Sequence, residues 1–195
     1  LARLMFVFSC FTGMAIADME KLEYRHIQTA ADGQRYIRKE RQKTKVEFIV
    51  PLHPIAEAII NYYRKEQARN EEQQTVKEKG DSLVFQPHCS RSVMGKNLSI
   101  VGKACGIRQR LSYHVARHTF GTMSLSAGIP IESIAKMMGH ASISSTQIYA
   151  QVTDNKISED MDRLIAKQSA KDKETMEREA CKSSDIVTCK MEETV

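Results

Sequence analysis

The stretch HVARHTFGT, residues 114–122, places an imidazole and a guanidinium three residues apart, at His114 and Arg117. In a helix these two side chains lie on the same face. A second stretch, MMGHASISSTQIYAQV, follows at residues 137–152 and contains Tyr149 near its end. Cationic and imidazole donors that precede a phenol suit a phosphodiester, because its oxygens accept hydrogen bonds and its phosphorus accepts a nucleophile.

Outward from these stretches, the apolar periodicity predicts a fold that is mainly α with a small antiparallel β-sheet, an α+β class. Two runs with period-two alternation predict a hairpin, with strands at 34–39 and 46–51 around a polar turn at 41–45. A short strand-like run is expected at 83–85, and the polar segment 70–79 is a surface loop or a helix extension. Helices are expected at 1–10, 15–22, 55–69, 93–105, 113–127, 131–138, 144–151 and 154–179.

Two further polar side chains fit the same chemistry. His140 follows Gly139 at the end of a predicted helix, and Lys43 occupies the tip of the predicted hairpin. Tyr149 is expected on the short helix at 144–151, which a nearby serine, Ser142 or Ser144, would cap.

Composition sets the broad class. With 195 residues, of which 42% are hydrophobic and 27% charged, the chain suits one domain with its own core. A formal net charge of +5 favours polyanionic partners only weakly. The cysteines are odd in number, five, and show no repeated spacing, which favours reduced intracellular thiols over a disulfide framework.

The N-terminal stretch has two interpretations. Arg3, the apolar run after it and the small-residue pattern at 15–17 match the crude template of a secretion signal. A buried helix explains the same stretch better, because its apolar positions fall on one helical face. No stretch is long enough to span a bilayer. The chain opens on Leu1 instead of Met, so we expect a fragment of a longer protein.

Each polar feature taken singly has a less specific explanation. His114 and His118, four residues apart, could form a metal pair, but no carboxylate or cysteine stands nearby with ligand spacing, which argues against zinc. The basic run at 35–45 could be a solvated edge that resists strand pairing.

The order of the motifs, however, resembles the catalytic domain of the tyrosine recombinases, the phage integrase family. That family has HxxRHxF, then LGH, then Thr-x-x-Tyr, which match residues 114–120, 139–140 and 146–149 here. FTGMAIADMEKLEYRHI, residues 11–27, looks like the first conserved box, and KTKVEFIVPL, residues 43–52, looks like the family's hairpin. The resemblance covers residues 1–165. It implies that 166–195 is a C-terminal helical extension and flexible tail, and that the family's smaller N-terminal core-binding domain is absent.

The resemblance also implies a role for each polar residue. Tyr149 would attack the scissile phosphodiester to give a 3′-phosphotyrosine bond, followed by strand exchange and religation without metal, ATP or any other cofactor. Arg117 would bind the nonbridging oxygens, Lys43 would protonate the departing 5′-oxygen, His114 would assist proton movement and His140 would donate to the phosphate.

The partner that the resemblance implies is double-stranded DNA carrying a recombination site. We expect a homotetramer on DNA and a monomer in isolation, in the bacterial cytoplasm at the nucleoid, with no membrane association. The expected DNA contacts are Arg41, Lys45, Arg91, Lys96 and Arg110.

One position departs from the family pattern. The first box of the family reads Thr-Gly-Leu-Arg, whereas residues 12–15 here are Thr-Gly-Met-Ala. Ala15 therefore replaces the first of two arginines that clamp the phosphate. Another cation could fill the gap, with Arg25, Arg38 or Lys39 as candidates. Certain integrases of conjugative and mobilizable elements also lack an arginine here, so the resemblance is compatible with an active enzyme. The alternative is a DNA-binding relative with weak or no cleavage. Asp18 in the same box is expected to be a structural brace.

Overall fold

The computed structural model describes residues 1–71, 82–86 and 89–149, together with 161–162, 164–166 and 168–169. The chain divides into two compact units, residues 1–150 and 151–195. The predicted segment at 72–79 and most of the predicted helix at 154–179 lie outside the described residues. Among those that are described, Met161, Leu164 and Ile165 are each about half exposed.

The helices of the first unit follow the sequence prediction, with two corrections. The predicted helices at 15–22 and 144–151 each shorten to four residues. After the first of these, Leu22 is fully buried and Glu23 forms an isolated β-bridge with Leu83, within the predicted strand-like run at 83–85. The helices are α1 (Ala2–Thr12), α2 (Ile16–Met19), the 3-10 helix η1 (Tyr24–His26), α3 (Pro54–Glu71), α4 (Arg91–Ala104), α5 (Tyr113–Ser126), α6 (Ile131–Met138) and α7 (Ser144–Gln147).

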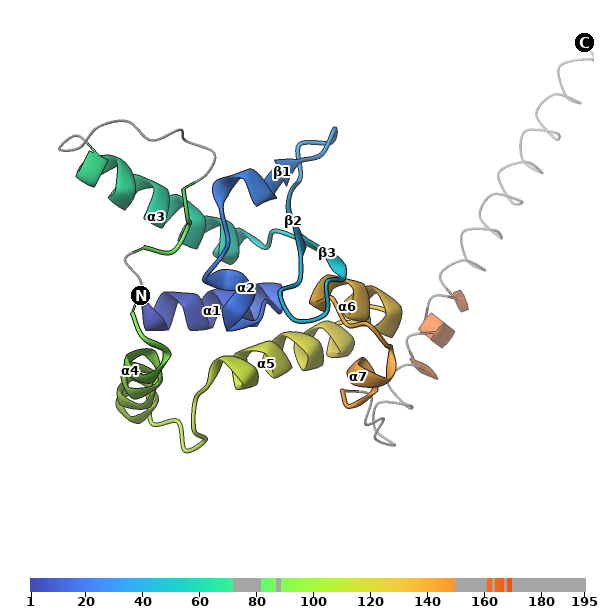
Figure 1. Cartoon of the computed structure of the whole chain (residues 1–195). Helices are drawn as coiled ribbons and strands as arrows, with labels where there is room; N and C mark the ends of the chain where they lie inside the picture. The colour runs from blue at the N-terminus through green and yellow to red at the C-terminus, as the bar shows by residue number, and fades with distance from the viewer. Residues whose placement is uncertain (72–81, 87–88, 150–160, 163, 167, 170–195) are drawn as a thin grey trace, which may run out of the picture. The chain divides into compact units, whose positions relative to one another are not determined.

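The sheet confirms the predicted hairpin and adds one strand. Strands β1 (Ile27–Thr29), β2 (Arg35–Glu40) and β3 (Glu47–Pro51) are antiparallel in the order β1-β2-β3. β1 was not predicted, because its three residues include one apolar side chain and offer no alternation to detect. The loop 41–46 between β2 and β3 lies beside α6 (Figure 1).

The alternation along β2 continues into this loop. Ile37 and Lys39 are buried, whereas Arg38 and Glu40 between and after them are exposed. The backbone N–H of Arg41 donates to the carbonyl of Val46 at 3.0 Å, which extends the ladder by one residue. Arg41 therefore follows Ile37 and Lys39 onto the inner face of the sheet.

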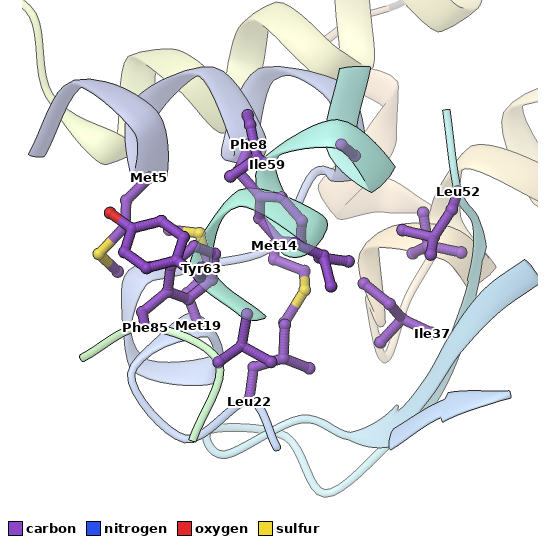
Figure 2. Packing of buried hydrophobic residues seen from close by; sticks show 14 of the residues in the cluster. Met5, Phe8, Met14, Met19, Leu22, Ile37, Leu52, Ile59, Tyr63 and Phe85 are labelled. Carbon is purple, nitrogen blue, oxygen red and sulfur yellow. The ribbon is translucent and has the colours of Figure 1, made fainter. Parts of the chain in front are cut away.

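The core is built around α1. Met5 and Phe8 on α1 are buried, which supports the core-helix interpretation of the N-terminal stretch. The ring of Phe85 lies edge-on to Phe8 at 5.1 Å and to Tyr63 at 5.2 Å. Figure 2 shows Met5, Tyr63 and Phe85 gathered together at one end of this cluster, which also includes Ile37 from the sheet. No helix within the described part of the chain is both long and apolar enough to cross a bilayer.

A left-handed glycine ends α1 and sets the course of the next segment. Gly13 has φ of 66°, and its N–H donates to the carbonyl of Ser9. A Cβ at this position would lie 2.5 Å from Cδ1 of Phe120 on α5. Both the backbone conformation and the close approach of α5 therefore require glycine here.

Candidate active site

Arg117 lies at the centre of the site, in the middle of α5. Its residue surface is 6% exposed, and its guanidinium donates to two backbone carbonyls, those of Gly13 and, at 2.5 Å, Met138. Burial, with the nearby Arg41 cation, lowers the Arg117 pKa to about 10. The side chain therefore stays charged at neutral pH and links the end of α1 to the end of α6.

Arg41 reaches the same place from the hairpin loop. Its Nη1 donates to the carbonyl of Gly139 at 3.2 Å, and its Nε lies 3.8 Å from Oδ2 of Asp18. Asp18 is buried, and its Oδ1 accepts the N–H of Gln42 at 2.7 Å. Asp18 thus braces the loop, as predicted. The hydroxyl of Thr44 also donates to the Gly139 carbonyl, so the loop is fixed to the end of α6 at two points.

The two lysines of the same loop are arranged differently. Lys43 and Lys45 are both exposed, and Lys45 has φ of 57°. With the described residues, the Lys43 ammonium forms no hydrogen bond or ion pair. The structure therefore brings Arg41, but not Lys43, into direct contact with the residues around Arg117.

His114, His118 and Tyr149 form a chain of contacts on the outer side of α5. The Nε2 atoms of the two histidines are 2.7 Å apart, so one of the rings must be neutral and accept from the other. The ring of His118 lies edge-on to that of Tyr149, with centroids 5.2 Å apart. Burial, followed by His114 and Arg117, lowers the pKa of His118. His118 thus connects the predicted proton-transfer residue to the predicted nucleophile.

Tyr149 lies just beyond α7, not within it as predicted. The helix ends at Gln147, and the N–H of Tyr149 donates to the carbonyl of Thr146 in the following turn. Ile143 is the residue before the helix, and the hydroxyl of the predicted Ser142 accepts the N–H of Ser144, the first residue of α7, at 3.3 Å. Burial raises the pKa of the phenol, while the cations of Arg117 and Arg41 act in the opposite direction.

Gly121 provides the space for the tyrosine ring. A Cβ at Gly121 would lie 2.8 Å from both Cε2 and Cζ of Tyr149, far closer than carbon atoms pack. The ring lies directly against the α5 backbone, one helical turn after Arg117.

His140 stands between the ends of α6 and α7. Its Nδ1 is 2.7 Å from the hydroxyl of the buried Thr146. Burial, together with Arg117 and Arg41, lowers the pKa of His140 to about 4. The ring is therefore neutral at physiological pH and can donate from one nitrogen only.

The remaining predicted DNA contacts, Arg91, Lys96 and Arg110, lie on α4 and in the segment before α5. Arg91 pairs with Glu20 through two bonds, at 3.0 and 2.6 Å. Arg91 and Arg110 line an open pocket of about 500 Å³ that also reaches His114. Lys96 is exposed on α4. No group of three or more metal-binding side chains occurs in the described ranges of the chain.

The sequence indicates no role in the site for Gly121 or Thr146. It suggests His118 only as half of a metal pair, and Arg41 only as a general DNA contact. The signal for Arg41 was present, since the period-two pattern of the strand before it, continued by two residues, puts this side chain on the buried face. Nothing in the sequence indicated that an α5 glycine would touch Tyr149.

Comparison with known proteins identifies the family. The sequence model of the phage integrase family matches residues 2–156. The tyrosine recombinase XerD of Listeria innocua serovar 6a is 30% identical over 152 residues, which are 73% of this chain and 47% of that protein. XerC of Listeria welshimeri serovar 6b is 34% identical over 117 residues, 58% of this chain and 38% of that protein. The chain spans about half the length of the XerD relatives that it matches.

Solved structures confirm the fold. The XerH site-specific recombinase, crystallised as a post-cleavage complex with palindromic difH substrate, matches with a TM-score of 0.63 at 21% identity, over 82% of this chain and 44% of that chain. The predicted α+β class with its small antiparallel sheet is therefore correct.

Proposed function

We propose that this chain, which belongs to the phage integrase family, breaks and rejoins DNA at a specific site through a covalent bond to Tyr149. The observation that carries the proposal is the position of this phenol. It contacts His118 on α5 and lies in the electrostatic field of both Arg117 and Arg41. A nucleophile beside two cations and an imidazole is suited to attack an anionic phosphorus centre.

In the proposed reaction, the oxygen of Tyr149 forms a bond to phosphorus as the bond from phosphorus to the 5′-oxygen breaks. The phenol proton passes to the pair formed by His118 and His114, one of which already accepts a hydrogen bond from the other. Lys43 gives a proton to the departing 5′-oxygen. The reverse reaction with a different 5′-hydroxyl rejoins the strands and conserves the energy of the diester.

The remaining groups bind the phosphate. Arg117 offers its charge to the nonbridging oxygens, which gain negative charge in the transition state. His140 contacts the Thr146 hydroxyl through Nδ1 at 2.7 Å. In the tautomer in which Nδ1 accepts from this hydroxyl, Nε2–H donates to the phosphate. The exposed Lys45, Lys96 and Arg110, with Arg91, contact the DNA backbone on either side.

The substrate is double-stranded DNA, and the active assembly is a homotetramer on that DNA. The XerH complex with difH substrate and the Tn1549 transposon integrase in complex with transposon right end DNA support the choice of DNA as substrate. DNA binding by this chain should weaken steeply with salt, because it depends on phosphate contacts.

The test is capture of a covalent adduct. The chain is incubated at low salt with a pool of nicked duplexes whose sequence is randomised, so that the short 5′-hydroxyl fragment released by cleavage diffuses away. We expect an adduct that resists denaturant with the wild-type chain and none with Tyr149→Phe. Sequencing of the captured DNA then gives the preferred site.

The alternative, a relative that binds DNA without cutting it, rests on Ala15. Retention of sequence-selective DNA in the pool without any covalent adduct would favour this alternative. Adduct formation that depends on Tyr149 would exclude it.

A further inference from the structure

We propose that Arg41 supplies the second phosphate-clamping cation, in place of the arginine missing at Ala15. This inference rests on the proposed function. It assigns to the hairpin loop a catalytic group that the family pattern places at the start of α2.

The first argument is the position of Arg41 relative to α2. Ala15 is the N-cap of α2, and its carbonyl accepts the N–H of Asp18 at 3.0 Å. Asp18 therefore lies one turn from Ala15, and Nε of Arg41 lies 3.8 Å from the Asp18 carboxylate. The Arg41 guanidinium thus lies beside the helix that begins at residue 15.

The second argument is that Arg41 and Arg117 lie side by side. Arg117 donates to the carbonyl of Met138, and Arg41 donates to the carbonyl of the next residue, Gly139. Figure 1 shows the loop between β2 and β3 beside α6, which ends at these two carbonyls. Two neighbouring guanidinium groups can each bind one of the two nonbridging oxygens of a phosphodiester.

The third argument is the balance of charge. Within the described part of the chain, Asp18 is the carboxylate that pairs with Arg41, and the hydrogen bonds of the Arg117 guanidinium go to neutral carbonyls. Nε of Arg41 is buried and has no hydrogen-bond acceptor among the described residues. Two cations beside one carboxylate leave a net positive site, which favours an anion.

The field of Arg41 also reaches the other residues of the site. It lowers the pKa of Arg117 and of His140, and it opposes the rise that burial causes in the pKa of Tyr149. A charge that acts on both the nucleophile and the phosphate-binding residues is close enough to act on the phosphate between them.

The three cations that the sequence suggests as replacements for the missing arginine contact other residues. Arg25 pairs with Glu23 at 2.5 Å, and Arg38, on the exposed face of β2, lies 3.8 Å from Glu47. The ammonium of Lys39 donates to the carbonyl of Lys21 at 2.8 Å and lies 3.3 Å from Nε2 of His26. None of these contacts involves the elements around Arg117.

The experiment compares four proteins on a nicked duplex that carries the sequence captured with the wild-type chain. Arg41→Ala should form adduct about 10²–10³-fold more slowly, the usual loss for one donor to a developing oxyanion. The double variant Ala15→Arg/Arg41→Ala should form adduct at least tenfold faster than Arg41→Ala. Arg38→Ala, which removes a guanidinium from the exposed face of the same hairpin, should cleave within about twofold of wild type.

A second substrate separates charge from structure. A methylphosphonate at the cleavage position replaces one nonbridging oxygen by a methyl group and removes the negative charge. On this duplex Arg41→Ala should cleave within about tenfold of wild type, because little charge remains to be neutralised. An equal loss on both substrates would mean that Arg41 only holds the loop in place, and would overturn the inference.

The outcomes distinguish this inference from the function beneath it. Absence of any adduct with the wild-type chain overturns both. An adduct that requires Tyr149 but forms at an unchanged rate with Arg41→Ala overturns only the role of Arg41.

Discussion

Lys43 in the hairpin loop and Arg117 on α5 are cations held in different ways. On α5, Arg117 is buried and bound to two carbonyls before any substrate arrives. In the loop, Lys43 is exposed and without a hydrogen bond to the described residues. The difference matches the proposed tasks, since a phosphate clamp benefits from preorganisation whereas a proton donor must follow the leaving group. Substitution of Lys43 should therefore affect the cleavage rate alone, whereas substitution of Arg117 should affect both the cleavage rate and the stability.

The largest effect is expected from Lys43→Ala. Loss of a general acid lowers the cleavage rate by about 10²–10⁴-fold, while the free energy of unfolding should change by less than about 0.5 kcal/mol, because the side chain is exposed. Adduct formation and urea denaturation measure the two quantities. A substrate with sulfur in place of the 5′-oxygen should rescue the rate, since a thiolate departs without a proton.

Lys45→Asn is the matched control for this change. It removes a neighbouring exposed charge, and asparagine tolerates the positive φ of this position. At saturating DNA it should cleave at the wild-type rate. Equal losses for the two loop variants would contradict a specific role for Lys43.

Arg117→Lys tests the buried cation on α5, for comparison with the exposed Lys43 of the loop. An ammonium keeps the charge but lacks the planar fork that spans the carbonyls of Gly13 and Met138. We expect cleavage to fall about 10²–10³-fold and stability to fall by about 1–3 kcal/mol, because a buried carbonyl loses its donor. Adduct formation and urea denaturation test the two effects. An unchanged free energy of unfolding would contradict the predicted loss of stability.

Gly121→Ala should act through position alone. The new methyl group would lie 2.8 Å from the ring of Tyr149 and push it away. A shift of this kind lowers the cleavage rate on the order of 10²-fold without removing any functional group. Gly95→Ala is the control, because a Cβ there would meet no atom within 4 Å; this variant should cleave normally.

The smallest effect concerns pH. The pKa of His140 is lowered from 6.5 to about 4 in the folded chain, so the unfolded chain binds more protons between these values. Stability should therefore decline as pH falls through this window. His140→Asn should make that decline shallower, as measured by urea denaturation from pH 4 to 7. It should not abolish the decline, because the pKa values of His26 and His118 are lowered too. An identical slope for both proteins would contradict this assignment.

Local patterns in the sequence predicted much of this fold. The apolar spacing of α1, α3 and α5 and the alternation of β2 and β3 are strong signals, because each element buries one face. Strand β1 is too short to show a period, and it forms because its neighbour β2 offers hydrogen-bond partners. Helix α7 is shorter than its polar and apolar pattern predicts, because it ends at Gln147 and the chain continues as a turn through Tyr149.

The site was predictable in its members but not in its contacts. Tyr149, Arg117 and His140 stand in motifs whose spacing is local. The contact of Arg41 with Gly139 joins residues 98 positions apart, and it depends on how the sheet packs against α6. Nearness in sequence favours Arg25, Arg38 and Lys39 as the missing cation. In the structure Arg38 lies on the exposed face of β2, whereas Arg41 lies on the opposite face and contacts Gly139.

The carbonyls of Met138 and Gly139 have a consequence for the empty protein. They occupy the donors of two guanidinium groups with backbone oxygens, much as the oxygens of a nucleic acid strand would. Each guanidinium has five N–H donors and uses only one or two of them on carbonyls, so the others are left for a phosphate. The carbonyls at the end of α6 thus keep the two positive charges together despite their mutual repulsion.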